Sequence, residues 1–109
     1  MNKELRIKKN EEFSRIMKER HSIASDCFVL YYSNKQLDKV RVGISVSKKL
    51  GNAVTRNKIK RQVRSMAYNL IDFNDYSKDM IIIVRKPYLD FDYAYDMADL
   101  EKLIKKAII

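Results

Sequence analysis

Three stretches of the chain space their apolar residues with the period of an α-helix. The first is predicted from about Glu11 to Arg20, where Asn10 can cap the helix. The second follows Thr55, another potential cap, and runs to about Asn69, and the third runs from Tyr93 to Ile108. The apolar positions that keep the 3.6-residue period are Phe13, Ile16 and Met17; Ile59, Val63, Met66, Ala67 and Leu70; and Met97, Leu100, Ile104, Ala107 and Ile108.

Three further stretches have the pattern of β-strands. Cys27 to Ser33 is β-branched and aromatic, and Val40 to Ser47 alternates between apolar residues and small, polar or basic ones, which is typical of an antiparallel strand with one open face. Asp79 to Arg85 is continuously apolar and is ended by Pro87, so it is predicted to be the central strand. In the first strand, alternation predicts one face with Phe28, Leu30 and Tyr32 and the opposite face with Val29, Tyr31 and Ser33. In the second strand, one face carries Val40, Val42, Ile44 and Val46, and the opposite face carries Arg41, Gly43, Ser45 and Ser47.

These elements predict one domain over residues 1–109. The segment from Asn34 to Lys39 reads as a polar turn and Gly51-Asn52 as another. The order is α, β, β, β or loop, α, β, α, and the fold class is α/β (α+β), with a sheet of about four strands packed by helices in two layers. No internal repeat or linker interrupts the chain, and a hydrophobic content of 46% supplies one core.

Charge is concentrated in the middle of the chain. Residues 41–71 carry eight basic and no acidic residues, whereas residues 1–40 carry nine basic and six acidic and residues 72–109 six basic and eight acidic, which sums to the net charge of +9. A folded domain with this distribution is typical of a polyanion-binding protein. A membrane surface is disfavoured because the basic segment lacks a wide apolar face, and no apolar run is long enough to span a bilayer. We expect a soluble cytoplasmic protein.

Several kinds of site are excluded by composition. Two glycines are too few for a dinucleotide fingerprint, and no P-loop spacing is present. A lone Cys27 and a lone His21 cannot form a disulfide or a tetrahedral Cys/His zinc site. We therefore expect no catalytic residues, no metal site and no cofactor bound by the protein alone; Cys27 is predicted to be a small buried or edge residue.

The segment from Ser45 to Arg64 is the strongest candidate for binding chemistry. On a helical wheel Asn57, Lys58, Arg61 and Arg64 lie opposite the apolar stripe, while Lys60 lies at its edge and Arg56 in the first turn. Lys48 and Lys49 precede the turn and can extend the same patch. A solvated face on a structural helix is the alternative, but five Lys or Arg in the nine residues 56–64 without one carboxylate would repel each other. We therefore favour phosphate binding by this face.

The same segment resembles the protein subunit of bacterial ribonuclease P. The resemblance rests on Lys49-Leu50-Gly51-Asn52-Ala53-Val54, then Arg56-Asn57-Lys58, then Lys60-Arg61-x-x-Arg64. Supporting matches cover most of the chain to Pro87 and comprise Leu5 to Lys9 leading into Phe13, Phe28 to Tyr31, Arg41 to Lys49 and Ile81 to Pro87. Lys58 stands where the family has a second Arg, Met17 where relatives often have an aromatic residue, and Ser25-Asp26-Cys27 where they have an Asn-Arg-x run.

The resemblance implies a fold and a set of partners. The central helix would cross between parallel strands with left-handed sense, which is rare. The partners would be the ribonuclease P RNA and precursor tRNA, with Mg²⁺ acting together with the RNA and no obligate protein partner. The residues expected to bind RNA are Lys48, Lys49, Asn52, Arg56, Asn57, Lys58, Lys60, Arg61 and Arg64. The residues expected in a cleft for the 5′ leader are Phe13, Met17, Tyr31, Arg41 and Ser45, and for Phe13 core packing remains an equal alternative.

Three other functions compete with this interpretation. A small basic ribosomal or other structural RNA-binding protein is the nearest, but it does not account for the Gly-Asn-Ala-Val-x-Arg-Asn junction. A transcription factor lacks support because no short helix and tight turn precede the basic helix. A stand-alone nuclease is disfavoured because the basic segment holds no Asp or Glu and His21 has no evident catalytic partner.

Overall fold

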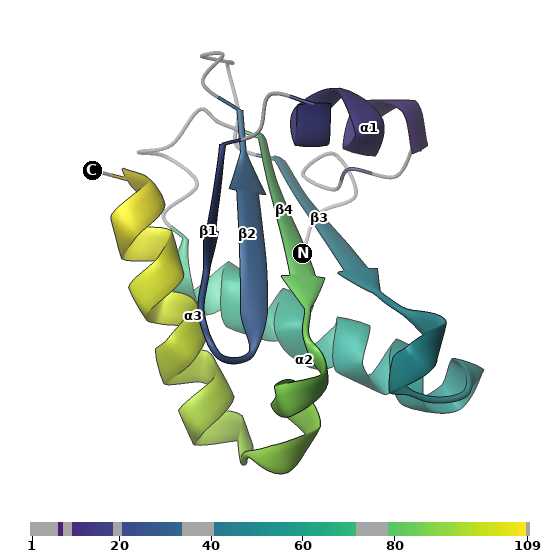
Figure 1. Ribbon diagram of the computed structural model, residues 1–109. Helices are drawn as coiled ribbons and strands as arrows, with labels where there is room; N and C mark the ends of the chain where they lie inside the picture. The colour runs from purple at the N-terminus through teal and green to yellow at the C-terminus, as the bar shows by residue number, and fades with distance from the viewer. Residues whose placement is uncertain (1–6, 8–9, 19–20, 34–40, 72–78, 109) are drawn as a thin grey trace.

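The computed structural model describes residues 7, 10–18, 21–33, 41–71 and 79–108 (Figure 1). The elements are α1 (Asn10–Lys18), β1 (Ser22–Ala24), β2 (Phe28–Tyr32), β3 (Arg41–Val46), the 3₁₀ turn η2 (Lys48–Leu50), α2 (Ala53–Leu70), β4 (Asp79–Val84), the 3₁₀ turn η3 (Lys86–Asp90) and α3 (Tyr93–Ile108). The predicted order of helices and strands and the α/β class are confirmed. The polar turn predicted at Asn34 to Lys39 lies outside the described residues.

The sheet has four strands in the order β1-β2-β4-β3. The apolar strand β4 is central, as predicted, and it pairs antiparallel with β2 and parallel with β3. The antiparallel setting expected for β3 is therefore wrong: the chain leaves β3 through a long helix instead of a hairpin, and this connection returns it in the same direction. In Figure 1 both strands point down, β4 lies to the left of β3 and α2 passes behind the sheet, so the crossover is left-handed.

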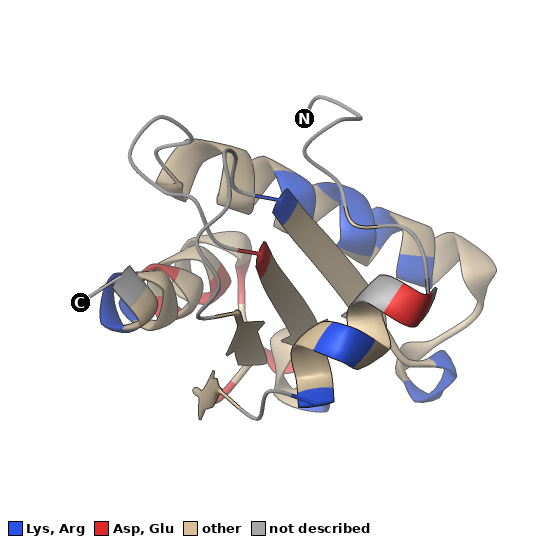
Figure 2. Ribbon diagram, turned by 90° about the horizontal axis from the view of Figure 1, so that it is seen from above, with Lys and Arg blue, Asp and Glu red and all other residues tan. Residues whose placement is uncertain are grey.

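The sheet buries its two faces differently. Phe28, Leu30, Val42, Met80 and Ile82 point into the main core, which α2 and α3 cover. On the opposite face α1 covers a smaller cluster, and Figure 2 shows α1 and α3 on opposite sides of the sheet. The residues of this smaller cluster are Ile7, Ile16 and Ile81, with Phe13, Tyr31 and Ile83 packed against them. One face is thus a closed core, and the other is only partly covered.

Several predicted details are corrected or refined by the structure. Asn52, not Thr55, caps α2, because its Oδ1 accepts a hydrogen bond from the Thr55 backbone N–H at 2.9 Å. Asn10, expected just before α1, is its first residue. β1 carries no alternating apolar pattern, so no residue range was predicted for it; it pairs antiparallel with β2. Cys27 is fully buried, as predicted.

No helix in the described ranges combines the length and the apolar character needed to cross a membrane.

Candidate nucleic-acid interface

The helix α2 carries most of the candidate binding residues, and its buried stripe fixes which of them face outward. Ile59, Val63, Met66 and Ala67 are buried in the core. Asn57, Lys58 and Arg61 are exposed, whereas Arg56, Lys60 and Arg64 are partly buried along its flanks. Figure 2 shows the basic residues along α2 and the acidic ones on α3. The helical wheel therefore placed Asn57, Lys58 and Arg61 correctly on the outer face, whereas Arg64, which it also placed there, lies on a partly buried flank.

The start of α2 concentrates positive charge. Its first turn contains no acidic residue, although the positive end of the helix dipole favours one there. The Nε atom of Arg56 is buried and has no hydrogen-bond partner among the described residues. Asn52 uses its Oδ1 for the cap, which leaves its side-chain N–H groups as donors. An anion at this helix end would be stabilised by both the dipole and the basic side chains.

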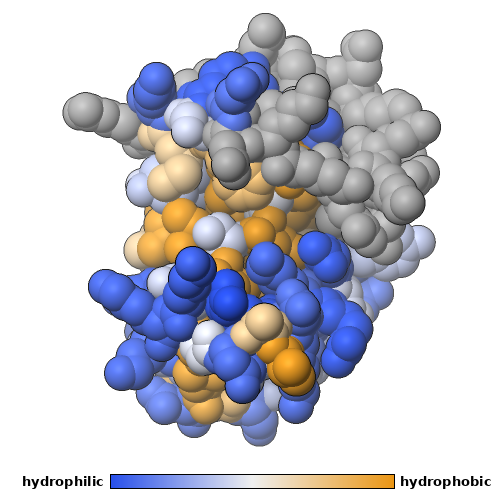
Figure 3. Space-filling model, turned by 90° about the vertical axis from the view of Figure 1, so that its right-hand side faces the viewer, coloured by the Kyte–Doolittle hydropathy of each residue, from blue (hydrophilic) through white to orange (hydrophobic). Residues whose placement is uncertain are grey.

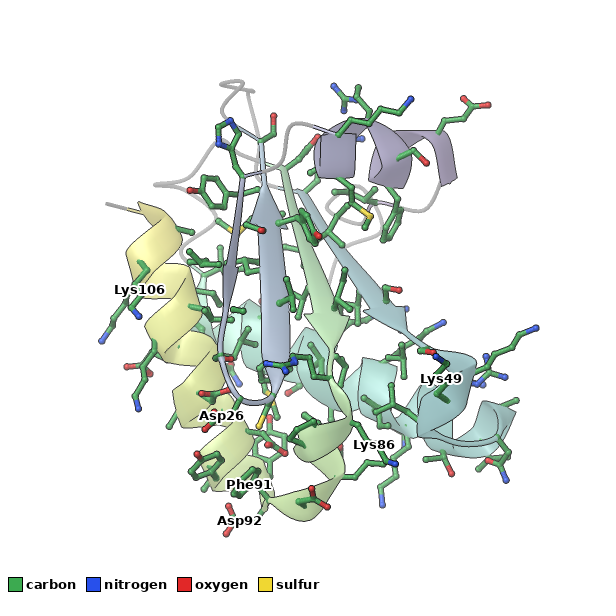
Figure 4. The ribbon with its side chains drawn as sticks, viewed as in Figure 1. Asp26, Lys49, Lys86, Phe91, Asp92 and Lys106 are labelled. Atoms are coloured by element: carbon green, nitrogen blue, oxygen red, sulfur yellow. The ribbon has the colours of Figure 1, made fainter. Side chains whose placement is uncertain are left out.

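The turn η2 extends the basic surface beyond the sheet. The Ser47 hydroxyl accepts from the Lys49 backbone N–H at 3.2 Å, and the buried Leu50 anchors the turn. Lys48 and Lys49 are exposed, and Figure 4 shows Lys49 at the outer end of the turn. Gly51 follows with φ of 150°, and a Cβ there would lie 2.9 Å from Thr55 Cγ2, so the junction into α2 requires glycine.

A groove of about 660 Å³ runs along the edge of the sheet between α1 and α2. Phe13, Ser14 and Met17 of α1 form one wall, Lys60 and Arg64 of α2 form the other, and β3 lies between them. The described residues that line it are Ile7, Phe13, Ser14, Met17, Ile44, Ser45, Val46, Lys60 and Arg64. Figure 3 shows this side of the molecule, with an apolar band between two hydrophilic regions. The groove thus combines an apolar wall with a cationic one.

The packing of Phe13 depends on Gly43. A Cβ at Gly43 would lie 2.6 Å from Cζ of Phe13, so the ring covers the space where a side chain would stand. Phe13 is half-buried: it packs against the cluster of Ile7, Ile16 and Ile81 and also lines the groove. Both roles considered for Phe13, core packing and cleft lining, are therefore found in one ring.

Arg41 is held by an ion pair that the sequence did not reveal. Its Nε donates to Asp79 Oδ1 at 2.9 Å and its NH2 to Oδ2 at 2.8 Å, a bidentate arrangement. Arg15 of α1 donates to the same Oδ2 at 3.2 Å. Asp79 is fully buried, so the two guanidinium groups compensate its charge.

The structure brings together some of the predicted cleft residues and separates others. Phe13, Met17 and Ser45 line the groove together with Lys60 and Arg64, which had been assigned to RNA binding in general. Tyr31 is half-buried on the same face of the sheet but belongs to the cluster under α1. Lys58 lies on the other flank of α2, in a smaller pocket beside η3. Neither Tyr31 nor Arg41 belongs to the groove lining.

Some residues that line the groove were not predicted to belong to a cleft. Ile7 was noted only as part of a matching segment; its backbone N–H donates to the Val42 carbonyl at 3.0 Å and so fixes the chain beside β3. Ile44 was assigned to the core by alternation, yet it reaches the groove because β3 is an edge strand.

The sequence contained one indication of the ion pair between Arg41 and Asp79. Asp79 is a charged residue at the start of the apolar strand β4, and a buried charge needs a partner.

The residues of the groove do not suit a metal ion. The described residues of the lining offer hydroxyl, ammonium and guanidinium groups but no carboxylate or imidazole. Over the described part of the chain, no group of three or more His, Cys, Asp or Glu side chains is placed to hold a metal.

Comparison with known proteins gives one consistent result. Residues 1–108 match the family model described as Ribonuclease P. The ribonuclease P protein component of Staphylococcus aureus is 47% identical over 108 residues, which cover 98% of this chain and 93% of that protein. The structure of a Staphylococcus aureus RNase P protein mutant with defective mRNA degradation activity superimposes with a TM-score of 0.86 at 45% identity, covering 96% of this chain and 89% of that one. The RNase P protein from Thermotoga maritima superimposes with a TM-score of 0.79 at 30% identity, covering 93% of this chain and 96% of that one.

Proposed function

The chain belongs to the family of bacterial ribonuclease P protein components, and from that membership we propose that its groove holds the single-stranded 5′ leader of precursor tRNA while η2 and the outer face of α2 bind the catalytic RNA. Family membership makes it the protein component of a ribonucleoprotein endonuclease that processes tRNA, with the ribonuclease P RNA as partner. The proposal concerns how this chain divides the two RNA ligands between two surfaces.

The observation that carries the proposal is the pairing of unlike walls in the groove. Phe13 and Met17 offer apolar surface on which unpaired bases can pack, and Lys60 and Arg64 offer cations for the phosphates. A single strand presents bases on one side and phosphates on the other, so it matches both walls at once. A duplex would present mainly phosphates, and the apolar wall would gain nothing from it.

The outer face of α2 has a different composition. Lys48, Lys49 and Arg61 are exposed and lie outside the groove with its apolar wall, so they suit the phosphate backbone of a folded RNA. We assign hydrolysis of the phosphodiester to the RNA with Mg²⁺, because the groove residues provide no ligand set for that ion and no general base. The protein's part is to bind and position the leader.

A binding experiment on the reconstituted complex tests the assignment of the groove. Lys60→Gln removes one cation from the groove wall, and Lys102→Gln removes one from the exposed surface of α3 as a matched control. We expect Lys60→Gln to weaken binding of precursor tRNA by about tenfold, the loss expected of one charge-assisted phosphate contact, and binding of mature tRNA by less than about 1.5-fold. Equal losses for the two tRNAs, or an equal loss in the Lys102 variant, would contradict the proposal.

A further inference from the structure

A second surface, at η3 and the start of α3, has chemistry opposite to that of α2. Four large apolar side chains within seven residues are exposed, each by 41–47%: Leu89, Phe91, Tyr93 and Tyr95. Asp90 and Asp92 between them are also exposed. Figure 4 shows Phe91 and Asp92 next to each other and well separated from Lys49. We refer to residues 89–96 as the η3–α3 surface.

The exposed rings of this surface are held in place by the protein. Phe91 and Tyr95 stack with ring centroids 4.0 Å apart and planes 18° apart. The Tyr95 hydroxyl donates to Asp26 Oδ2 at 3.0 Å, and the Tyr95 backbone N–H donates to Asp92 Oδ1 at 2.9 Å. Rings fixed before binding lose little conformational entropy on binding. The surface is therefore preorganised.

A pocket of about 220 Å³ lies beside these rings and contains a buried carboxylate. Tyr88, Phe91 and Tyr93 line it together with Asp96, which is 2% exposed. The Oδ1 atom of Asp96 is buried and has no hydrogen-bond partner among the described residues. Helix capping accounts for Asp92 but not for this oxygen, and a buried carboxylate oxygen without a donor is costly. Among the described residues, no donor group therefore reaches the Oδ1 atom of Asp96 in this pocket.

The charge of the surrounding sequence identifies the class of partner. Residues 87–101 contain five Asp or Glu and no Lys or Arg, in a protein of net charge +9. Carboxylates repel phosphates, so this surface does not suit RNA. A carboxylate beside aromatic rings suits an ammonium or guanidinium group, which the ring faces also attract. The exposed rings around the pocket suit a polypeptide more than a free cation, because a polypeptide can cover them.

We propose that the η3–α3 surface binds a Lys- or Arg-rich segment of a partner protein, with one cationic side chain entering the pocket beside Asp96. The volume of the pocket admits one such side chain, and Asp90 and Asp92 attract its neighbours. Lys58 also lines the pocket, but it is exposed, and the Oδ1 atom of Asp96 has no hydrogen-bond partner among the described residues. The catalytic RNA and the partner segment would then occupy different sides of the protein.

The test uses the full-length protein and a short fluorescent peptide of alternating Arg and Ser, with a peptide of alternating Glu and Ser as the charge control. Asp96→Asn removes the buried charge at constant shape, and Asp92→Asn removes an exposed one while keeping a residue that can cap. Glu101→Gln is the matched control, because it makes the same change on the same helix where the carboxylate already pairs with Lys105 at 2.8 Å. Fluorescence anisotropy at several peptide concentrations gives the affinities.

We expect Asp96→Asn to weaken binding of the Arg peptide about tenfold, Asp92→Asn about threefold and Glu101→Gln not measurably, since a desolvated charge contributes more than an exposed one. Lys58→Gln should strengthen binding, because it removes a like charge from the pocket wall.

Equal losses in all three acidic variants would show general attraction to an acidic surface and overturn the proposal. Displacement of the peptide by the catalytic RNA would overturn it too. So would self-association in sedimentation that Asp92→Asn abolishes, because the occupant would then be a second copy. The peptide titrations contain no RNA, so their outcome is independent of the function proposed for the groove.

Discussion

Two stretches of this chain each carry one sign of charge without its opposite. Residues 41–71 hold eight basic and no acidic residues, and residues 87–101 hold five acidic and no basic ones. In the first, the charges stand outside a buried apolar stripe and remain in contact with water. In the second, Asp96 and Asp99 are buried, and only part of the charge reaches the surface. The two stretches look equivalent, with opposite sign, when charges alone are counted, but they differ in how far their charged side chains are buried.

The difference shows what each stretch gains from its charge. An exposed basic surface keeps its hydration and attracts a polyanion. A buried carboxylate costs stability unless something pairs with it. Asp99 has partners, since it accepts hydrogen bonds from the Ser25 hydroxyl at 2.6 Å and from the Cys27 backbone N–H at 3.0 Å. Asp96 interacts with the Cys27 thiol, but its Oδ1 has no hydrogen-bond partner among the described residues, so the two aspartates of α3 differ in how fully their carboxylates are hydrogen-bonded.

The first prediction removes two exposed cations from the basic stretch. The double variant of Lys49→Ala and Arg61→Ala should weaken binding to the catalytic RNA about a hundredfold, at roughly 1.5 kcal/mol for each charge-assisted contact. Each lost phosphate contact should reduce the slope of log affinity against log salt by about 0.7–0.9. Filter binding over a range of salt concentrations measures both quantities.

The control for this variant removes the same charge from the opposite side of the molecule. Lys102 and Lys106 are exposed on α3, and Figure 4 shows Lys106 far from Lys49. Replacing both by Ala should change RNA affinity less than about twofold, because exposed charges beyond a Debye length are screened. If the two double variants lost equal affinity, net charge and not the α2 surface would explain RNA binding.

The second prediction concerns the buried charge of the acidic stretch. The pKa of Asp96 is raised from 3.8 to about 6, chiefly by burial and also by the charges of Asp99 and Asp92, while a hydrogen bond with the Cys27 thiol lowers it. Because the folded protein holds this proton more tightly than the unfolded chain, the stability due to neutral Asp96 is full below about pH 4 and is lost as the pH rises to about 6. Asp96→Asn should therefore stabilise the protein by up to about 3 kcal/mol above pH 6.

Urea unfolding of the Asp96→Asn variant and the parent protein at several pH values checks this expectation. The difference in unfolding free energy should vanish near pH 4, since both proteins are then neutral at this position. Glu101→Gln serves as the reference, because its carboxylate pairs with Lys105 on the surface. A difference that does not depend on pH would show that packing, and not ionisation, sets the cost of Asp96.

Local patterns predicted the elements of this fold because each pattern reports which faces of the element are buried. The apolar stripe of α2 and the continuous apolar run of β4 are of this kind, and the structure confirms both. Alternation along β3 did not reveal the direction of its partner, because side chains alternate equally in parallel and antiparallel pairs. Thr55 and Asn52 are both good caps, and only the backbone path after Gly51 selects Asn52.

The candidate site was predictable where it lies on one element and not where it joins several. The helical wheel placed Arg61 and Asn57 outward from α2 alone. The meeting of Lys60 with Phe13 and Met17 depends on where α1 crosses the sheet. The ion pair of Arg41 depends on the register that places Arg41 beside Asp79, residues that are 38 positions apart. Such contacts follow from the topology, which a single sequence pattern does not contain.

The third prediction tests shape within the basic stretch at constant charge. Gly43→Ala places a methyl group where the Phe13 ring now lies, at 2.6 Å from Cζ, so the ring must move away from the sheet. Overpacking of this kind should cost about 1–2 kcal/mol of unfolding free energy. Adding Phe13→Leu should recover part of that loss, because the shorter side chain leaves room for the methyl group. Urea unfolding of both single variants and the double variant gives the coupling, and strictly additive effects would mean that the two positions do not share this space.

The last and smallest effect is expected at Tyr31, which lies on the same sheet face as Phe13 but outside the groove lining. Its ring is half-buried and packs against the cluster of Ile7, Ile16 and Ile81. Tyr31→Leu keeps apolar bulk and removes the ring. Since base stacking on a fully available ring contributes about 1–3 kcal/mol, a partly covered ring should contribute at the lower end, about a fivefold loss in precursor tRNA affinity. Mature tRNA affinity and melting temperature should stay nearly constant. Measuring the two tRNA affinities beside the melting temperature separates the roles: a lower melting temperature with unchanged affinities would assign Tyr31 to the cluster under α1 alone, and the leader would then contact only the groove between Phe13 and Lys60.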